Sequence, residues 1–152
     1  MTDSPHVSPN PFGDAAPKED RVGLAANAMA AGMAIAIAAI AVVAWATTRA
    51  AANSGITSKE TITNGFAVNL VIYGTLGSIF LSGIVAWLLM ATVDSNYRRG
   101  GLSMVSAFAG FLLSVILTML VRGVFGVAAL PALAALAALV GVFFIRRARA
   151  AV

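Results

Sequence analysis

The 152-residue chain contains no cysteine and a single histidine, His6, which precedes every apolar segment. Without cysteine, the protein has no disulfide, no thiolate metal site, no iron–sulfur ligand and no c-type haem attachment. A histidine in a polar tail cannot supply the imidazole that a haem, a copper ion or a proton path needs inside a membrane. We therefore expect no cofactor and no metal, haem or flavin held by side chains of this chain.

Acidic residues are almost as scarce, and none of them falls within an apolar run. A catalytic site needs a base, a nucleophile or a metal ligand within reach of one another. Ion-coupled carriers usually place carboxylates or broken helices near the membrane midplane. The sequence therefore predicts that the protein is not an enzyme, and it disfavours coupled transport. The six acidic residues are Asp3, Asp14, Glu19, Asp20, Glu60 and Asp94.

What the chain has instead is four long apolar runs without ionisable residues. A hydrocarbon core about 30 Å thick needs about 20 residues of helix, and each run reaches that length. Hydrophobic residues make up 60% of the chain, and its mean hydropathy is +0.92. We expect an all-α membrane protein with four transmembrane helices in an antiparallel bundle, residues 22–152, after a disordered or extended tail, residues 1–21. The four runs are residues 23–46, 66–93, 102–121 and 124–145.

The first run is expected to remain as a span rather than to be cleaved as a signal peptide. It is 24 residues long, and a net acidic segment precedes it. A signal peptide usually has an apolar region of about 7 to 15 residues after a basic start. Heavy use of alanine and glycine is typical of a GC-rich bacterial genome, so composition favours a bacterial inner membrane.

The N-terminal tail is rich in proline, with Pro5, Pro9, Pro11 and Pro17 before the first charged cluster. Such a segment cannot bury enough apolar surface to fold alone, which predicts a disordered cytoplasmic tail. An alternative is a docking strap that becomes ordered on a partner subunit. In that case Pro9 and Pro11 hold the backbone extended and Phe12 enters a pocket of the partner.

Small residues recur at every fourth position on three of the runs. Such rows allow helix backbones to approach closely in a membrane, so we expect helix packing at all three. The row of the third run also carries hydroxyls and is predicted to pack most closely against that of the second. Alternatively, it lines a water path. The rows are Ala28, Gly32 and Ala36; Gly74, Ser78 and Ser82; and Ser106, Gly110, Ser114 and Thr118.

The ends of the middle runs carry capping signals. Asp94 and Arg98 are four residues apart and would pair if the second helix continued past the membrane, with Gly100 as its C-cap. Ser103 is then a suitable N-cap for the third helix. Tyr73 is a bulky polar group within the second run, for which interhelical hydrogen bonding is the favoured role and a ligand pocket the alternative.

Only Arg122 and Gly123 separate the third run from the fourth, so the last two helices are predicted to lie adjacent and antiparallel. Pro131 is favoured in the first turn of a helix but kinks a helix interior. The fourth helix is therefore predicted to begin at Pro131, with Val124 as the alternative start.

Basic residues divide unevenly between the two sides of a four-span chain. Under the positive-inside rule, both termini are cytoplasmic and the 49–65 connection faces outward. These residues are expected to contact anionic lipid headgroups rather than nucleic acid, and membrane anchoring is assigned to Trp45, Arg98, Arg99, Arg146, Arg147 and Arg149. Seven basic residues lie on the side of the termini, against three on the other: Lys18, Arg21, Arg98, Arg99, Arg146, Arg147 and Arg149, against Arg49, Lys59 and Arg122.

Three functions remain compatible with such a chain. The first is a cofactor-free accessory subunit of a larger respiratory or photosynthetic type of membrane complex, with other membrane subunits as its partners. The second is a small oligomeric transporter or channel around the hydroxyl-bearing helix face. The third is a membrane anchor that recruits a cytoplasmic partner through its tail. The first reading is favoured because the spans offer packing surfaces but no reactive groups.

Overall fold

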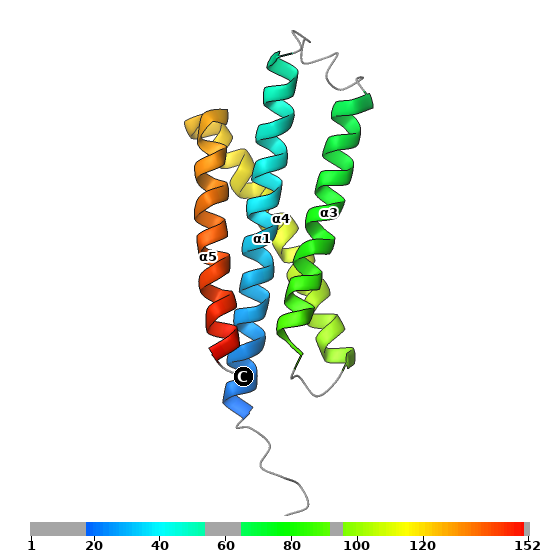
Figure 1. Ribbon diagram of the computed structural model, residues 1–152, viewed down its shortest axis with the longest axis vertical. Coiled ribbons are helices and arrows are strands. Elements are labelled where there is room, and N and C mark those ends of the chain that lie inside the picture. Colours follow the sequence, from blue (N-terminus) through cyan, green and yellow to red (C-terminus); the bar gives the residue numbers. More distant parts are fainter. Residues whose placement is uncertain (1–17, 54–64, 92–95, 151–152) are drawn as a thin grey trace, which may run out of the picture.

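The computed structural model describes residues 18–53, 65–91 and 96–150. These residues form α1 (Lys18–Asn53), α3 (Gly65–Leu89), α4 (Asn96–Phe125), the short 3-10 helix η1 (Val127–Ala129) and α5 (Leu130–Ala150). Successive long helices run in opposite directions, so α1 begins at the end of the bundle where α5 finishes (Figure 1). Each long helix contains a stretch that is long and apolar enough to cross a membrane. The predicted all-α fold with four candidate spans is confirmed.

Helix α1 is the centre of the bundle and packs against α3, α4 and α5, whereas α3 and α5 scarcely touch each other (Figure 1). The first and third long helices, α1 and α4, run in parallel and stand in direct contact. A Cβ added at Gly110 of α4 would lie 3.0 Å from the Met33 Cα and 3.1 Å from the Ala36 Cβ of α1. This approach is possible because both helices carry small residues where they meet.

Gly32 marks the point where three helices meet. A Cβ at this position of α1 would lie 2.8 Å from the Ser82 carbonyl oxygen of α3 and 2.7 Å from the Ser106 Oγ of α4. On another side of α1, a Cβ at Gly141 of α5 would be 3.6 Å from the Ala34 Cβ. Helix α1 is thin because most of its side chains are small, and this allows three helices to approach it closely.

The short connection between α4 and α5 predicted that these two helices pack against each other. Helix α5 packs mainly against α1 instead. The two helices touch little beyond the turn that joins them, and most contacts of α5 are with α1. Helix α4 also runs obliquely behind α1, while α5 descends beside α1 (Figure 1). Helices α4 and α5 are antiparallel, as predicted, but the prediction that they pack as neighbours was wrong (Figure 1). Helix α5 instead packs on small side chains of α1 such as Ala34, and small residues allow such close approach.

The connection between α4 and α5 lies at Gly126, since Arg122 and Gly123 belong to α4. Gly126 has φ +79°, a conformation that is strained for residues with a Cβ, and its N–H still donates to the Arg122 carbonyl at 3.1 Å. Helix α5 then begins at Leu130, so Pro131 occupies the first turn. The predicted start at Pro131 is confirmed within one residue, and the alternative start at Val124 is excluded.

The other helix ends differ from the predicted ones. Helix α1 continues to Asn53 and α3 stops at Leu89, before the predicted end at residue 93. Helix α4 already begins at Asn96, so Gly100 lies inside this helix and is not a C-cap. Ser103 is not an N-cap either, because its hydroxyl donates to the Gly100 carbonyl at 2.8 Å within the helix. Asp94 lies outside the described residues.

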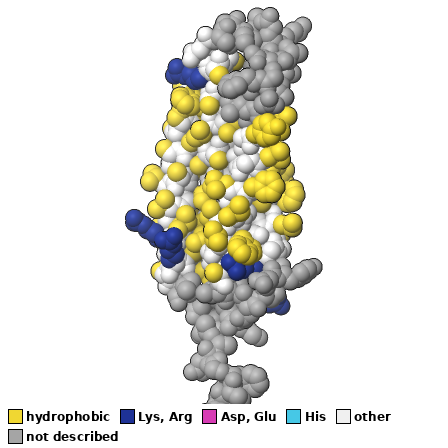
Figure 2. Space-filling model, turned by 45° about the vertical axis from the view of Figure 1, so that its right-hand side comes forward, with side chains coloured by type: hydrophobic (Ala, Val, Ile, Leu, Met, Phe, Trp, Pro, Cys, Tyr) yellow, Lys and Arg dark blue, Asp and Glu magenta, His cyan; other side chains and the backbone are white. Residues whose placement is uncertain are grey.

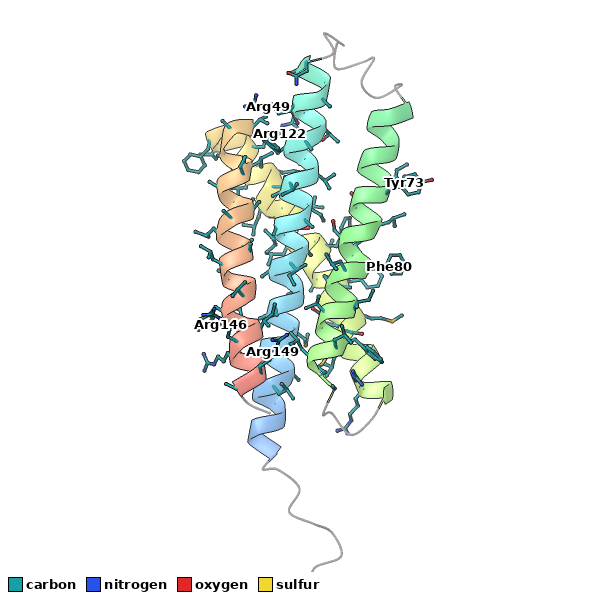
Figure 3. The ribbon with its side chains drawn as sticks, in the orientation of Figure 1. Arg49, Tyr73, Phe80, Arg122, Arg146 and Arg149 are labelled. Atoms are coloured by element: carbon teal, nitrogen blue, oxygen red, sulfur yellow. The ribbon has the colours of Figure 1, made fainter. Side chains whose placement is uncertain are left out.

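The outer surface suits a lipid environment. Hydrophobic side chains cover the visible face along most of its height, and basic side chains appear only toward its ends (Figure 2). Large apolar side chains such as Phe80, Leu112 and Leu139 are more than half exposed. Lipid tails are as apolar as leucine, so such exposure is inexpensive in a membrane. Tyr73, predicted to hydrogen-bond between helices, instead points away from the bundle and is 70% exposed (Figure 3).

Candidate functional site

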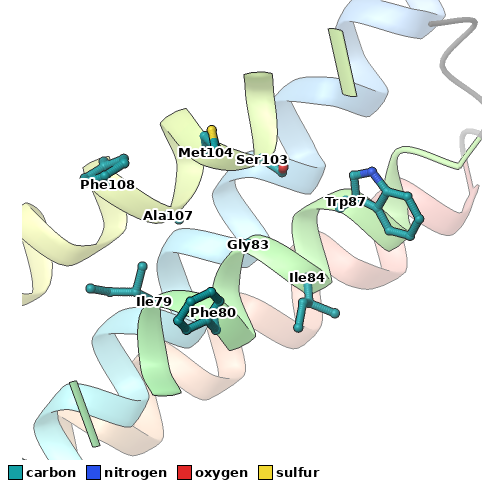
Figure 4. A pocket seen from close by; sticks show the side chains of 9 residues that line it. All are labelled: Ile79, Phe80, Gly83, Ile84, Trp87, Ser103, Met104, Ala107 and Phe108. Carbon is teal, nitrogen blue, oxygen red and sulfur yellow. The ribbon is translucent and has the colours of Figure 1, made fainter. Parts of the chain in front are cut away.

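An apolar groove lies between α3 and α4 (Figure 4). Its volume is about 400 Å³, which is within the range of small-molecule pockets. Residues at helical spacing, three to four apart, bring side chains of both helices to the same outer face. The lining is almost entirely apolar and consists of Ile79, Phe80, Gly83, Ile84, Trp87, Ser103, Met104, Ala107 and Phe108.

Small residues form the floor of this groove and large ones form its walls. A Cβ at Gly83 of α3 would lie 3.6 Å from the Ala107 Cβ of α4, an ordinary contact distance. Beside this contact, Phe80, Met104 and Phe108 stand outward with exposed fractions of 68%, 67% and 64%. The groove therefore exists because two helices approach at Gly83 and Ala107 while their larger neighbours project on either side.

Arg99 stands beside Trp87, at one end of the groove. Its Nε donates a 2.6 Å hydrogen bond to the Trp87 carbonyl oxygen. Its guanidinium carbon lies 3.9 Å from the centroid of the Trp87 ring, within cation–π range. The arginine of α4 is thus fixed on the last turn of α3 by two contacts with one residue.

This hydrogen bond takes the place of a helical one at the end of α3. In a continued α-helix, the Trp87 carbonyl would accept the N–H of Ala91. Instead the Ala91 N–H donates to the Leu88 carbonyl at 3.2 Å, and the Trp87 carbonyl accepts from Arg99. A basic side chain near a helix C-terminus satisfies a free carbonyl and opposes the helix dipole. Met90 then turns inward and is fully buried in a cluster with Ala28 and Ala86.

The predicted hydroxyl-bearing row of α4 faces α1. Ser106, Ser114, Thr118 and Gly110 are all buried within the chain. The Ser106 hydroxyl donates to the Met29 carbonyl of α1 at 2.9 Å, and Gly110 stands against Met33. The prediction that this row packs mainly against the row of Gly74, Ser78 and Ser82 is therefore wrong. Rows of small residues permit close approach, but they do not specify which rows pair.

The rows of small residues on α1 and α3 also lie in the contacts between helices. Ala28, Ala36 and Ser82 are fully buried, and Ser78 is nearly so. A Cβ at Gly74 would lie 2.7 Å from a methyl carbon of Val43 on α1. The rows of α3 and α4 therefore both pack against α1, which contributes the third row.

Most buried hydroxyls are engaged by backbone carbonyls of their own helices. Ser78 donates to Gly74 at 2.6 Å, Ser82 to Ile79 at 3.2 Å and Ser114 to Phe111 at 2.7 Å. Among the described residues, Thr118 alone has a buried hydroxyl without a hydrogen-bond partner. These bonds satisfy the hydroxyls locally, as a low-dielectric membrane interior requires.

The described arginines gather toward the two ends of the bundle. Arg49 and Arg122 lie near one end, and Arg146 and Arg149 lie toward the other (Figure 3). The first turn of α4 places Arg98 and Arg99 toward the latter end, with Arg147 on the last turns of α5. Trp45, the predicted anchor on α1, has its ring centroid 5.8 Å from the Arg49 guanidinium carbon.

The predicted strap residues Pro9, Pro11 and Phe12 lie outside the described residues, so the strap remains a prediction. In the described part of the chain, no group of three or more histidine, cysteine or acidic side chains could hold a metal ion. The expectation that the chain binds no metal or cofactor by its own side chains likewise remains a prediction.

Sequence reasoning missed the groove, and it gave Arg99 only an anchoring role. One available signal was a tryptophan near the end of a span, followed after a short connection by paired arginines. A second was Gly83, a small residue among large apolar ones. Neither signal reveals which residue of α4 stands opposite Gly83, because that depends on how the helices cross.

Comparison of the chain with protein-family models, curated proteins and solved structures found no match. Function therefore has to be argued from the residues of this chain.

Proposed function

We propose that this protein is a cofactor-free structural subunit of a larger membrane assembly of the respiratory or photosynthetic type. In this role its helices contribute packing surfaces and its N-terminal tail fastens it to a partner subunit. The proposal includes location in a bacterial inner membrane. It also includes cytoplasmic termini, for which the support is the excess of basic residues on that side of the chain.

The observation that carries this proposal is the use made of the polar groups inside the bundle. The Ser78, Ser82 and Ser114 hydroxyls bond to backbone carbonyls of their own helices, and Ser106 joins α4 to α1. The three intrahelical bonds satisfy their hydroxyls locally, and the Ser106 bond holds two helices together. A protein whose membrane-embedded polar groups serve packing is suited to a structural role.

The channel alternative is weakened by the position of the α4 row. A passage between copies of the chain would require Ser106, Gly110 and Ser114 to face outward. These residues are buried against α1 in a single chain, and a Cβ at Gly110 already comes within 3.0 Å of the Met33 backbone. Exposing the row would require α1 and α4 to separate.

The membrane-anchor alternative differs from the proposal in the partner that it requires. A simple anchor needs one apolar span, whereas this chain maintains a closely packed interior around α1. Such packing is useful where neighbouring subunits need a rigid surface of defined shape. It favours the structural subunit over the anchor.

Native-size analysis of gently solubilised membranes tests the proposal. The full chain, carrying a small C-terminal tag, is expressed at its natural level, and the size and composition of its particles are determined by native gel and mass spectrometry. The expected result is a particle with the same additional membrane subunits in fixed stoichiometry across two mild detergents. A homo-oligomer would support the channel instead. A monomer bound only to a soluble protein would support the anchor.

A further inference from the structure

We propose that the α3–α4 groove is a binding site for one anionic phospholipid of the surrounding bilayer. An acyl chain lies in the apolar groove, and the headgroup phosphate is held at Arg99. This inference is independent of the proposed function, since the site would exist in any membrane assembly that leaves the groove open.

The shape and lining of the groove fit an acyl chain. From Ile79 to Trp87 it follows about two turns of α3, or about 12 Å. Because Gly83 and Ala107 are small, their contact leaves space between the outward Phe80 and Phe108 side chains. A hydrocarbon chain needs no hydrogen-bonding partner, and the lining offers almost none.

The charge at one end of the groove fits a phosphate. The Arg99 guanidinium is held against Trp87 by the hydrogen bond from its Nε and by the cation–π contact with the indole ring. These contacts orient the cation without neutralising it, because neither the carbonyl nor the indole ring carries a negative charge. A guanidinium has five N–H donors, and the Trp87 bond uses one of them. Bidentate donation to phosphate is a common use of arginine.

The position of Arg99 matches the depth of a lipid headgroup. It lies in the first turns of α4, where the positive end of the helix dipole adds to the local potential. Trp87 belongs to the last turn of α3, as expected for an aromatic side chain at the membrane surface. Basic pockets between transmembrane helices are known to hold anionic headgroups, and here such a pocket continues into an apolar groove.

Titration of the purified full chain with dioleoyl phosphatidylglycerol, followed by native mass spectrometry, tests the proposal. Dioleoyl phosphatidylcholine has the same acyl chains but no net charge, so it isolates the role of the headgroup. We expect one tightly bound phosphatidylglycerol per chain, with affinity at least about tenfold above that of phosphatidylcholine. Equal binding of the two lipids would overturn the proposal.

Two substitutions locate the bound lipid. Arg99→Gln should weaken phosphatidylglycerol binding by about tenfold or more, whereas Arg122→Gln, which removes an exposed arginine at the other end of the same helix, should leave it unchanged. Gly83→Leu should fill the groove and abolish binding, because even its Cβ would already stand at contact distance, 3.6 Å, from the Ala107 Cβ. Equal losses for Arg99→Gln and Arg122→Gln would indicate diffuse attraction and overturn the site.

Gly83→Leu also decides the outcome if Arg99→Gln fails to fold, because it addresses the groove without changing the charge. Undiminished lipid binding by this variant would refute the proposal. In native membranes, a photo-crosslinking residue at Met104 should capture lipid. Capture of a partner helix in place of lipid would assign the groove to a protein contact and also overturn the proposal.

Discussion

The Ser106 hydroxyl of α4 donates a 2.9 Å hydrogen bond to the Met29 carbonyl oxygen of α1. Among the buried hydroxyls of the described residues, Ser106 alone donates to another helix. The bond joins the first and third helices of an up-and-down chain, which a regular bundle would place on a diagonal. It lies beside Gly32, where α1, α3 and α4 come together. The centre of the protein is therefore held by small residues and one interhelical hydroxyl.

Replacing Ser106 by alanine should lower stability by about 0.6 kcal/mol and by no more than about 1.7 kcal/mol, the range for interhelical hydrogen bonds in membranes. Ser114→Ala is the matched control, because the Ser114 hydroxyl is equally buried but donates within α4 to Phe111. Thermal unfolding of both variants in one detergent measures the difference. A loss for Ser114→Ala as large as that for Ser106→Ala would contradict the assigned role.

Gly32→Ala should destabilise the bundle by about 1–3 kcal/mol, because the added methyl would stand 2.8 Å from the Ser82 carbonyl oxygen. Gly110→Leu should have a larger effect, since even its Cβ meets the Met33 backbone at 3.0 Å. Gly77→Ala is the control on α3, where a Cβ has nothing within 4 Å. Thermal denaturation followed by circular dichroism would rank the stabilities of the three variants. Equal melting temperatures for Gly32→Ala and Gly77→Ala would contradict the close approach of the helices at Gly32.

Gly126→Ala should cost about 1–3 kcal/mol because φ +79° is strained for a residue with a Cβ, even though no neighbouring atom obstructs it. Gly123→Ala, three residues earlier in α4, also meets no atom within 4 Å and should be neutral or slightly stabilising. The same unfolding measurement compares them. Equal stability of the two variants would mean that the chain can turn between α4 and α5 without the glycine conformation.

Single cysteines introduced into this cysteine-free chain should report its orientation in the membrane. Asn53→Cys at the end of α1 should react with an impermeant maleimide from the outside of intact cells or spheroplasts, whereas Ala150→Cys at the end of α5 should react only after lysis. The reason is the seven-to-three excess of basic residues on the side of the termini. The reverse labelling pattern would place both termini outside.

Deletion of residues 1–16 should leave membrane insertion and the helix bundle intact but weaken association with the partner subunits. Phe12→Ala should reproduce part of this loss, since one buried aromatic side chain often carries much of a small interface. Val7→Ala is a control within the same tail. Subunit ratios after affinity purification provide the measurement. Unchanged ratios for the deletion would show that the tail is not a strap.

The helix boundaries show how well capping signals predict helix ends in this chain. Pro131 indicated the start of the last helix correctly, because a proline restricts its own backbone and lacks an N–H regardless of the surroundings. Gly100 and Ser103 indicated the ends of the middle helices wrongly. Glycine and serine are compatible with a helix interior, and at the end of α3 the Trp87 carbonyl accepts from Arg99 of the next helix, a contact that local capping signals do not reveal.

The amino-acid sequence by itself determined that the chain forms four apolar helices with basic ends, because run length and the absence of buried charge decide how a segment partitions into a bilayer. Only the tertiary structure decided that α1 is the centre, that the Ser106 row faces Met29 and that Gly83 and Ala107 leave a groove. Lipid is as apolar as a protein interior, so hydrophobicity does not mark which side of a membrane helix faces inward. Small residues show where backbones can approach, but the choice of partner depends on the simultaneous fit of all four helices.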